Sequence, residues 1–246
     1  MLTLEMMSQV RKAQTRLAEI IRFLEVDVHE CDFNLSQWKH HIMPTGWSNL
    51  DTSLRIGGIP RGSSTEIWAR EGGDTLRFAL KMARERQAKG EHVALLDPFG
   101  EFDAPRLLDF GLDPEKTIVL ATENPEALAA ITARLMENLD LLILPPGLTQ
   151  FQWLRSVRND PRGPENEPSK TPFQHALGAL AWEARRTGAS LLILREAHEA
   201  YYTAPLGVSQ LRFRLLPQSG HANRRLRIEH NVFTPETVGQ VLELGE

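Results

Sequence analysis

The sequence is short of several residue types, and each shortage excludes a class of protein. One residue in 246 is a cysteine, Cys31, so no intrachain disulfide can form, which indicates a reducing compartment. Lys and Arg number 28 against 32 Asp and Glu, whereas a dedicated nucleic-acid-binding protein is usually basic. No stretch approaches the roughly 18 consecutive apolar residues of a membrane helix, and residues 1–11 lack the apolar run of a secretory signal. These absences predict a cytoplasmic protein.

What the sequence does contain is typical of a soluble globular domain. Hydrophobic residues make up 41% of the chain and charged residues 24%, with a net charge of −4. A chain of 246 residues is long enough to bury a core in one domain with small appendages. Any contact with DNA would have to come from a local basic patch.

Short apolar runs alternate with amphipathic stretches through the middle of the chain. Near-continuous apolar runs predict strands that are buried on both faces. We expect strands at residues 65–68, 92–97, 117–121, 139–144 and 190–195, and helices at residues 76–89, 105–110, 125–138 and 173–187. Residues 210–216 and 225–230 alternate apolar with charged side chains, which predicts half-buried antiparallel strands. The predicted fold is an α/β domain: a mainly parallel twisted sheet flanked by helices, with antiparallel edge strands near the C-terminus.

Both ends of the chain differ from this middle part. Residues 3–25 form a predicted amphipathic helix, because apolar side chains recur every three or four residues. Two interpretations stay open: the apolar side covers the protein's own core, or it binds a partner or another copy through Met6, Val10, Leu17, Ile21 and Leu24. We expect a helix and linker at residues 1–43, the core at 44–232, and a tail at 233–246 with a weak helical pattern at 235–242.

An ordered series of short motifs precedes the first predicted strand. Glycines permit positive φ and Pro60 fixes its own backbone, so the series can reverse the chain before the strand begins. The series resembles the start of the RecA core: Thr45-Gly46, Leu50-Asp51, the turn Gly57-Gly58-Ile59-Pro60-Arg61-Gly62, and Thr65-Glu66-Ile67. The resemblance extends over residues 44–232 and implies a RecA-like core.

The resemblance places the phosphate loop of a nucleotide site at residues 69–76. Such a loop needs G-x-x-x-x-G-K-[ST], because backbone N–H groups and the lysine hold phosphate while the hydroxyl holds Mg²⁺. Here Ala69 and Asp74 replace the two glycines, and Thr75 and Leu76 replace the lysine and the hydroxyl. Asp74 adds negative charge where phosphate would sit. The degenerate loop reads Ala69, Arg70, Glu71, Gly72, Gly73, Asp74, Thr75 and Leu76.

Further positions of the family's nucleotide site have also changed. The Walker B carboxylate, a magnesium ligand, is replaced by Pro145. The resemblance aligns the catalytic glutamate with Phe99, although Glu101 is close by, and the glutamine that senses nucleotide with Arg195. We therefore predict no catalytic residue, no cofactor and no ATP hydrolysis. We also predict no metal site, because no zinc spacing is matched by His29, Cys31, His40 and His41.

An N-terminal helix, a degenerate phosphate loop and an arginine-rich end at residues 211–231 together resemble the ImuA group of RecA-like, or SulA-like, proteins. This resemblance implies a non-catalytic adaptor in DNA-damage-induced translesion synthesis. The partners it implies are an ImuB-like protein, an error-prone replicative-type polymerase and RecA, in the cytoplasm or at the nucleoid. Three alternatives stay open: a DNA-binding recombination mediator, a residual ATPase, and a SulA-type inhibitor of cell division.

The arginine-rich end has two interpretations. In the first, a basic DNA-binding patch is formed by Arg212, Arg214, Arg224, Arg225 and Arg227. In the second, the same side chains line the solvated face of edge strands, where charge discourages edge-to-edge pairing. We favour the second interpretation because the chain as a whole is acidic. The loop at residues 159–172, in the place of a RecA DNA-binding loop, carries mixed charge, which argues against strong attraction to phosphate.

Overall fold

The fold comes from a computed structural model, which describes residues 41–69, 74–97, 102–121, 132, 134–145, 172–196, 208–217 and 224–244. The chain divides into two units, residues 1–38 and 39–246. The first unit lies wholly outside the described residues. The expected helix at 3–25, with its candidate partner-binding residues Met6, Val10, Leu17, Ile21 and Leu24, therefore stays a prediction.

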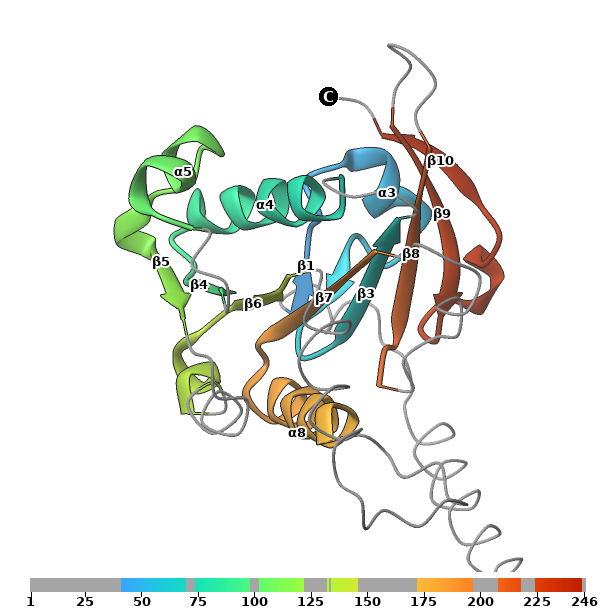
Figure 1. The fold of residues 1–246 in the computed structure, drawn as a ribbon. Coiled ribbons are helices and arrows are strands. Elements are labelled where there is room, and N and C mark those ends of the chain that lie inside the picture. Colours follow the sequence, from blue (N-terminus) through green and yellow to red (C-terminus); the bar gives the residue numbers. More distant parts are fainter. Residues whose placement is uncertain are drawn as a thin grey trace, which may run out of the picture. The chain divides into compact units, whose positions relative to one another are not determined.

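Eight strands form the central sheet of the second unit (Figure 1): β3 (Ser64–Ala69), β4 (Val93–Leu96), β5 (Thr117–Leu120), β6 (Leu141–Leu144), β7 (Ser190–Glu196), β8 (Leu211–Leu216), β9 (Arg224–Asn231) and β10 (Val241–Leu244). Their order across the sheet is β10-β9-β8-β3-β7-β6-β4-β5. The six strands from β8 to β5 in this order are parallel, whereas β9 and β10 run antiparallel to their neighbours. The predicted class, a mainly parallel sheet with antiparallel strands near the C-terminus, is confirmed.

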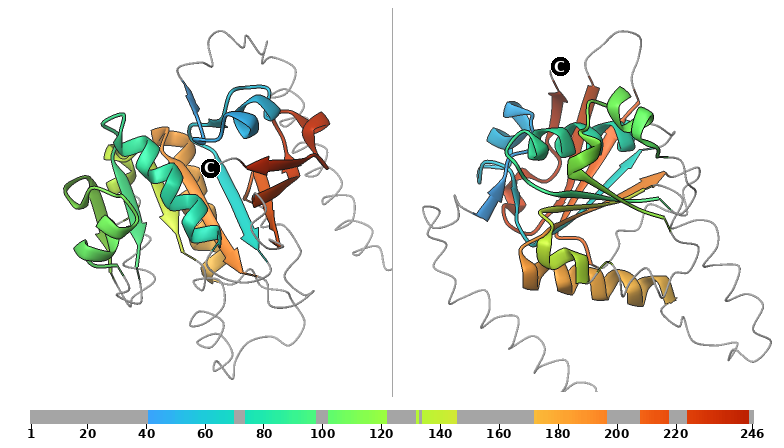
Figure 2. Two further views of the ribbon diagram at one scale, coloured as in Figure 1. Left: turned by 90° about the horizontal axis from the view of Figure 1, so that it is seen from above. Right: turned by 90° about the vertical axis from the view of Figure 1, so that its left-hand side faces the viewer.

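Helices cover both faces of this sheet. α4 (Asp74–Gln87) crosses one face, with the shorter α3 (Ser48–Ser53) and α5 (Ala104–Asp109) on the same side. α8 (Pro172–Thr187) lies against the opposite face, as the right-hand view of Figure 2 shows. The two faces are called the α4 side and the α8 side below, because each carries a different set of buried residues.

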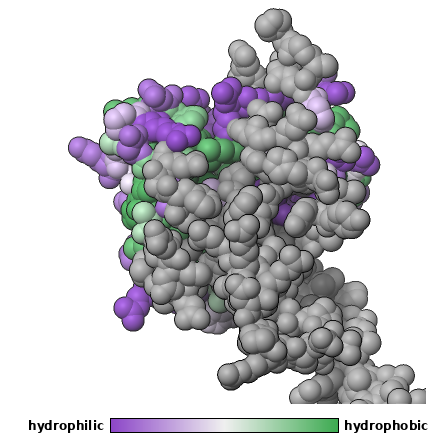
Figure 3. Space-filling view, in the orientation of Figure 1, coloured by the Kyte–Doolittle hydropathy of each residue, from purple (hydrophilic) through white to green (hydrophobic). Residues whose placement is uncertain are grey.

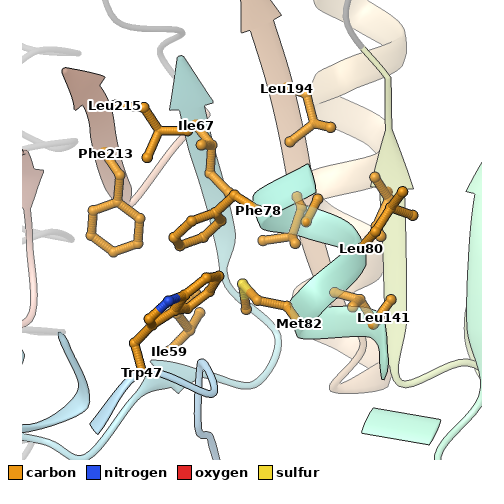
Figure 4. Close-up of a cluster of buried hydrophobic side chains, with 14 of the residues drawn as sticks. Trp47, Ile59, Ile67, Phe78, Leu80, Met82, Leu141, Leu194, Phe213 and Leu215 are labelled. Atoms are coloured by element: carbon orange, nitrogen blue, oxygen red, sulfur yellow. The ribbon is translucent and has the colours of Figure 1, made fainter. Parts of the chain in front are cut away.

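The larger hydrophobic core fills the space between α4 and the sheet (Figure 4). Phe78 and Met82 of α4 lie with Ile67 of β3 and Phe213 of β8 in one buried cluster. Trp47, which precedes α3, stacks on Phe78 with a centroid separation of 4.2 Å and an interplanar angle of 11°. This core includes residues of β3, β4, β6, β7, β8, β9 and β10, so the α4 side is apolar across most of the sheet.

The smaller core lies under α8 and covers only part of its face. Leu177 and Leu180 of α8 belong to one buried cluster with Leu142 of β6 and with Leu191 and Ile193 of β7. All strand residues of this cluster come from β4, β6 and β7. The α8 side of β3, β8 and β9 therefore contributes nothing to this second core, and a different chemistry occupies it.

The glycine-rich turn before β3 closes a small hairpin of β1 (Ile42–Met43) and β2 (Ile59–Pro60), which pair antiparallel. Gly57 and Gly58 have φ values of +90° and +150°, in the region that disfavours other residues. A Cβ atom on Gly58 would lie 2.3 Å from the carbonyl oxygen of Met43. Glycine is therefore required at this position, and the chain reverses before the first central strand as the motif predicts.

The C-terminal tail corrects one prediction. A weak helix was expected at residues 235–242, but the structure has a 3-10 helix at Pro235–Thr237 followed by the strand β10. Gly239, with φ of +92°, interrupts any continuous helix. Leu242 and Leu244 then alternate with exposed Val241 and pack against the α4-side core, which is the period of a strand. The predicted helix at 125–138 lies largely outside the described residues, which include a 3-10 helix at Met136–Asn138.

The surface formed by the described residues is mixed in polarity. Hydrophilic residues line the upper rim in Figure 3, and hydrophobic residues gather on the flank that carries β5 and α5. Two exposed side chains of that flank are Ile118 of β5 and Leu108 of α5. Within the described ranges, no helix combines the length and apolar character needed to cross a lipid bilayer.

Candidate functional site

The degenerate phosphate loop connects the first central strand to the first long helix. β3 ends at Ala69 and α4 begins at Asp74, while residues 70–73 lie outside the described residues. This order places a helix N-terminus at the carboxyl edge of a parallel sheet, which is where phosphate binds in many nucleotide-binding folds. The position of the loop therefore fits a nucleotide site, and its residues decide what such a site can hold.

Thr75 stands at the lysine position and is fully buried in the first turn of α4. Its Oγ1 has no hydrogen-bond partner in the described part of the chain. Leu76, at the hydroxyl position, is half-buried and packs against the α4-side core. A buried hydroxyl and an aliphatic side chain supply no positive charge, so neither residue can neutralise a phosphate.

The carboxyl ends of β4 and β6 belong to the same edge of the sheet. Asp97 follows β4 and is 2% exposed, and its Oδ2 accepts a 2.8 Å hydrogen bond from the backbone N–H of Phe102. Pro145 follows β6, is buried, and has no side-chain oxygen to offer a metal ion. Among the residues that the structure describes, no group of three His, Cys, Asp or Glu side chains could hold a metal.

A cluster of buried charges lies on the α8 side of β3, β7, β8 and β9. Glu66 and Trp68 of β3 alternate with Ile67, which belongs to the α4-side core, so both point to the α8 side. In the sheet register, Glu66 is opposite Arg212 of β8, and Trp68 is opposite Arg195 of β7. We name this group the Glu66 cluster: Glu66, Trp68, Arg195, Arg212 and Glu229.

Multiple polar contacts hold the Glu66 cluster together. Glu66 is fully buried; its Oε1 accepts a hydrogen bond from Arg195 Nη1 and lies 3.5 Å from Arg212 Nε. Arg212 Nε lies 3.4 Å from Glu229 Oε2, which also accepts a 2.6 Å hydrogen bond from Trp68 Nε1. The guanidinium carbon of Arg212 is 5.2 Å from the Trp68 ring centre, a cation–π contact. Buried charges need such a set of partners because each has lost its hydration.

A β-bulge brings Glu229 to the cluster. Arg212 pairs with His230, but the next residue, Phe213, pairs with Ile228, so Glu229 is an extra residue on β9. Its carboxylate is thereby shared: Arg214 Nη1 lies 3.8 Å from Glu229 Oε1, and the Arg214 guanidinium lies 4.6 Å from the Trp68 ring centre. One irregularity in the strand pairing thus lets two arginines meet one carboxylate.

Arg195 stands, by resemblance, at the position of the nucleotide-sensing glutamine. Its side chain is 8% exposed and its guanidinium binds the carboxylate of Glu66 on the neighbouring strand. A side chain engaged in this way is fixed by the sheet, because freeing it would deprive a buried carboxylate of one of its two arginine partners. The arginine at the carboxyl end of β7 is therefore bound to a carboxylate of the protein itself.

The structure divides the five arginines that the first interpretation places in one basic patch. Arg212 is 4% exposed and belongs to the Glu66 cluster, so it cannot reach a nucleic-acid phosphate. Arg224 lies on the α4 side of β9, whereas Arg225 and Arg227 point to the α8 side and are exposed. Arg214 shares that face, directly opposite Arg227, with 28% of its side chain exposed. Three of the five therefore share one accessible face.

A second group of charges closes the amino edge of the parallel strands. Arg61 forms ion pairs with Glu91 and, at 2.9 Å, with Asp140. Glu91 also lies 3.6 Å from Arg86, which is 1% exposed, and burial lowers the pKa of the Arg86 guanidinium. These contacts join the segments that precede β3, β4 and β6, so their role is structural.

Sequence patterns did not identify the Glu66 cluster as a unit. The resemblance to RecA singles out Glu66, and the resemblance and the end of a buried strand single out Arg195, whereas the patterns predict only strands at Trp68 and Glu229. The available signal was Glu66, the only charged residue in the predicted strand at 65–68, because a buried carboxylate must find a partner. Its partners lie on strands distant in sequence, and only the pairing of those strands identifies them.

Comparison with known sequences gives a consistent set of relatives. Residues 31–145 match the RecA N-terminal domain family. The chain is 24% identical to protein RecA of Malacoplasma penetrans over 201 residues, which cover 81% of this chain and 57% of that protein. It is 32% identical to protein RecA of Clostridium botulinum over 102 residues, which cover 41% of this chain and 29% of that protein. The chain thus spans little more than half the length of the first of these relatives and less of the second.

Comparison with solved structures agrees on the fold. The crystal structure of the RadB recombinase superposes with a TM-score of 0.60 and 20% sequence identity. The matched region covers 82% of this chain and 96% of the RadB chain. An α/β core with a mainly parallel sheet and antiparallel strands near the C-terminus is therefore common to both.

Proposed function

We propose that this chain, a RecA-like protein by its fold and by its sequence similarity, is a non-catalytic adaptor in DNA-damage-induced translesion synthesis. In this role it binds an ImuB-type polymerase-like partner, an error-prone replicative-type polymerase or RecA. The proposal rests on which residues stand at the edge of the sheet where a RecA-like protein would bind nucleotide. There, the residues at the lysine and metal-ligand positions are a buried threonine and a proline.

Phosphoryl transfer depends on positioned positive charge, which the described residues Thr75 and Leu76 do not supply. Thr75 offers no charge, Pro145 offers no ligand to magnesium, and Asp97 is already bound to backbone. The neighbouring Arg195 is held by Glu66 within the sheet. A RecA-like fold with such an edge supports a role in binding other macromolecules.

Two sets of similarities support a role in the response to DNA damage. Two relatives of known sequence are RecA proteins, and a solved structure with a similar fold is a recombinase. The degenerate loop and the arginine-rich strands β8 and β9 resemble the ImuA group. The partners named above come from that resemblance.

Purified full chain tests the absence of catalysis. We expect no Mg²⁺-dependent ATP hydrolysis, and no heat of binding when a non-hydrolysable ATP analogue is titrated with Mg²⁺, while RecA measured in parallel gives both signals. Thr75→Lys is a useful second sample. It restores the lysine, but the metal-ligand position is still occupied by Pro145, so ATP turnover should not return. Turnover in the unmodified chain would overturn the non-catalytic part of the proposal.

Cells test the adaptor role. Deletion of the gene should abolish most of the increase in mutation frequency that follows ultraviolet irradiation, and the full chain should co-purify with an ImuB-type protein. Unchanged damage-induced mutagenesis in the deletion strain, together with the absence of co-purification, would remove the proposal.

A second candidate function, binding of single-stranded DNA, is favoured by one observation. Arg214, Arg225 and Arg227 share the α8 side of β8 and β9. The double substitution Arg225→Glu and Arg227→Glu should weaken salt-dependent binding of a fluorescent oligonucleotide if this face contacts phosphate. Arg224→Glu, on the opposite side of β9, is the matched control and should leave that binding unchanged.

A further inference from the structure

Two arginines stand directly opposite each other at the β10 end of the sheet (Figure 1). Arg214 of β8 pairs with Arg227 of β9 in the antiparallel register, and both side chains point to the α8 side. Like charges at directly opposed positions destabilise a sheet, because the two Cβ atoms are only about 5 Å apart. A local conflict of this kind is typical of a functional site.

The protein's own carboxylates satisfy only one member of this pair. Arg214 lies 3.8 Å from Glu229 and over the ring of Trp68. Arg227 is exposed, and no hydrogen bond or ion pair joins it to any residue of the described part. Arg225 follows on the same face of β9 and is likewise exposed and without an ion pair among the described residues. Two positive charges are therefore held beside Arg214 without a counter-charge bound to either.

The neighbouring charges of the described strands leave this face positive. The Glu66 cluster is neutral in itself, because its two arginines match its two carboxylates. Outside that cluster, the one acidic residue in the described parts of β8, β9 and β10 is Glu243, which is exposed and directly opposite Arg225. Arg214, Arg225 and Arg227 thus face a single carboxylate beyond the cluster, so the complementary ligand carries negative charge.

Apolar side chains belong to the same face. Val241 of β10 is directly opposite Arg227 and is 51% exposed, and Leu216 of β8 is opposite Arg225 and half-buried. The buried cluster under α8 contains no residue of these three strands. Arginine beside exposed aliphatic groups is the composition of a protein interface, whereas a DNA-binding surface is more polar and much more basic. The face therefore fits a protein surface that offers both carboxylates and apolar groups.

We propose that an acidic segment of a protein partner docks on the Arg227 face, which is formed by Arg214, Leu216, Arg225, Arg227 and Val241. One carboxylate of the segment lies between Arg214 and Arg227, a second lies at Arg225, and an apolar side chain packs on Val241. A second copy that met this chain through the same face would bring arginines against arginines, so it is the poorer occupant. The inference rests on the proposed function for the existence of a protein partner, and it adds the surface and the chemistry of that partner.

Short labelled peptides test the proposal on the full chain. All carry leucine at alternate positions and differ in the residues between, which are Glu, Gln or Lys, and an oligonucleotide of thymidines is measured beside them. Fluorescence anisotropy should show that the acidic peptide binds most tightly and that its affinity falls as salt increases. Arg227→Glu should weaken that binding by about tenfold or more, because it places a like charge against the incoming carboxylate. Val241→Ser should weaken it by about fivefold through lost apolar contact.

Two control variants match these changes elsewhere on the molecule. Arg224→Glu makes the same charge reversal on the opposite side of β9, and Leu108→Ser removes an exposed aliphatic side chain from α5. Both should leave the affinity for the acidic peptide unchanged. Circular dichroism of each variant shows whether it is folded.

Stability gives a second measurement, which separates a ligand-binding arginine from a structural one. Arg227→Glu replaces a like-charge pair by an opposite-charge pair with Arg214, so the urea midpoint of the free chain should rise at low salt. The rise should become smaller at high salt, because both side chains are accessible to solvent. A gain in stability together with a loss of peptide binding is expected of a residue kept for its ligand. A lower midpoint at low salt would instead show that Arg227 supports the sheet, and would overturn the proposal.

The binding outcomes distinguish this inference from the proposed function. Equal binding of the three peptides, or acidic-peptide binding that survives Arg227→Glu, would overturn the docking surface even if the adaptor role stands. Oligonucleotide binding that is tighter than acidic-peptide binding and insensitive to Val241→Ser would overturn it in favour of DNA. Self-association that Arg227→Glu abolishes, in the absence of peptide binding, would make the face an interface between copies. Selective acidic-peptide binding in a protein whose deletion leaves mutagenesis unchanged would keep the surface and remove only the translesion role.

Discussion

The α8 side of the sheet has two halves that were built in opposite ways. Under α8, strands β4, β6 and β7 present aliphatic side chains that pack into a dry core. Beside them, β3, β8 and β9 present the Glu66 cluster, in which two arginines and two carboxylates are buried or nearly so. The α4 side of the same strands is mostly apolar, so the two sides of one strand differ in chemistry. Specific ion pairs and hydrogen bonds hold the strands of the charged half together, whereas buried apolar surface area stabilises the apolar half.

The largest expected effect comes from removing the central carboxylate. Glu66→Ala leaves Arg195 and Arg212 buried without that partner, and we expect a loss of about 3–5 kcal/mol in the free energy of unfolding. Replacing Glu66, Arg195 and Arg212 together by Leu removes Glu66 with both of its arginines and leaves Glu229 with Arg214, and should recover about half or more of the loss. Urea denaturation measures both variants. A triple variant that is less stable than Glu66→Ala would mean that the charges stabilise beyond mutual neutralisation.

The matched change in the apolar half is Leu191→Ala on β7, two residues into the same strand that carries Arg195. Leu191 is fully buried in the core under α8, so we expect a loss of about 3 kcal/mol from lost apolar burial and the resulting cavity. The loss in the free energy of unfolding caused by Leu191→Ala should be the same at low and high salt. The loss caused by Glu66→Ala should change with salt concentration if water reaches the arginines that remain in the cluster. Identical salt responses of the two variants would contradict the division of this face into two kinds of core.

The rim of the charged half should respond weakly. Arg214 lies over Trp68 and 3.8 Å from Glu229, but more than a quarter of its side chain is exposed. Solvent screens such a contact, so Arg214→Ala should cost about 1 kcal/mol or less, with a smaller effect at high salt. Arg214→Lys retains the charge but loses the planar stacking on the indole. Equal stabilities of these two variants would assign the contribution of Arg214 to charge alone, and a loss comparable to that of Glu66→Ala would move Arg214 into the buried part of the cluster.

The apolar half could be predicted from the sequence, whereas only the strands of the charged half could be, and not the contacts between their charged side chains. β4, β6 and β7 read as apolar runs because both of their faces are buried, and their predicted bounds differ from the structure by at most two residues. α3, with a single buried residue, Leu50, in a polar hexamer, carries no such periodicity and was not predicted. Glu66 and Arg195 are 129 residues apart, and their contact depends on strand order. The bulge at Glu229 shifts the register by one residue, which no local pattern in β9 reveals.

The smallest expected effect lies outside both halves, at the turn that precedes the sheet. Asp51 accepts hydrogen bonds from the backbone N–H and the Oγ1 of Thr45, at 2.8 and 2.7 Å. Burial raises the pKa of Asp51, and the Thr45 hydrogen bonds and the charge of Arg86 oppose this rise without cancelling it. A pKa that is higher in the folded state means that protonation of Asp51 favours folding. This contribution is present below the ordinary aspartate pKa of about 4 and is lost as the pH rises through the folded value.

Asp51→Asn removes this titration and keeps the Oδ1 acceptor. We therefore expect the variant to gain stability relative to the unmodified chain as the pH rises above about 4, and the difference to level off once Asp51 is fully ionised. Urea denaturation across this range measures the difference, with Asp109→Asn on the exposed side of α5 as a control for the change in net charge. A difference that falls with rising pH would mean that the hydrogen bonds to the ionised carboxylate outweigh its burial. In that case the turn would resemble the charged half of the sheet, where hydrogen bonds and ion pairs determine stability. It would differ from the apolar half, where burial determines stability.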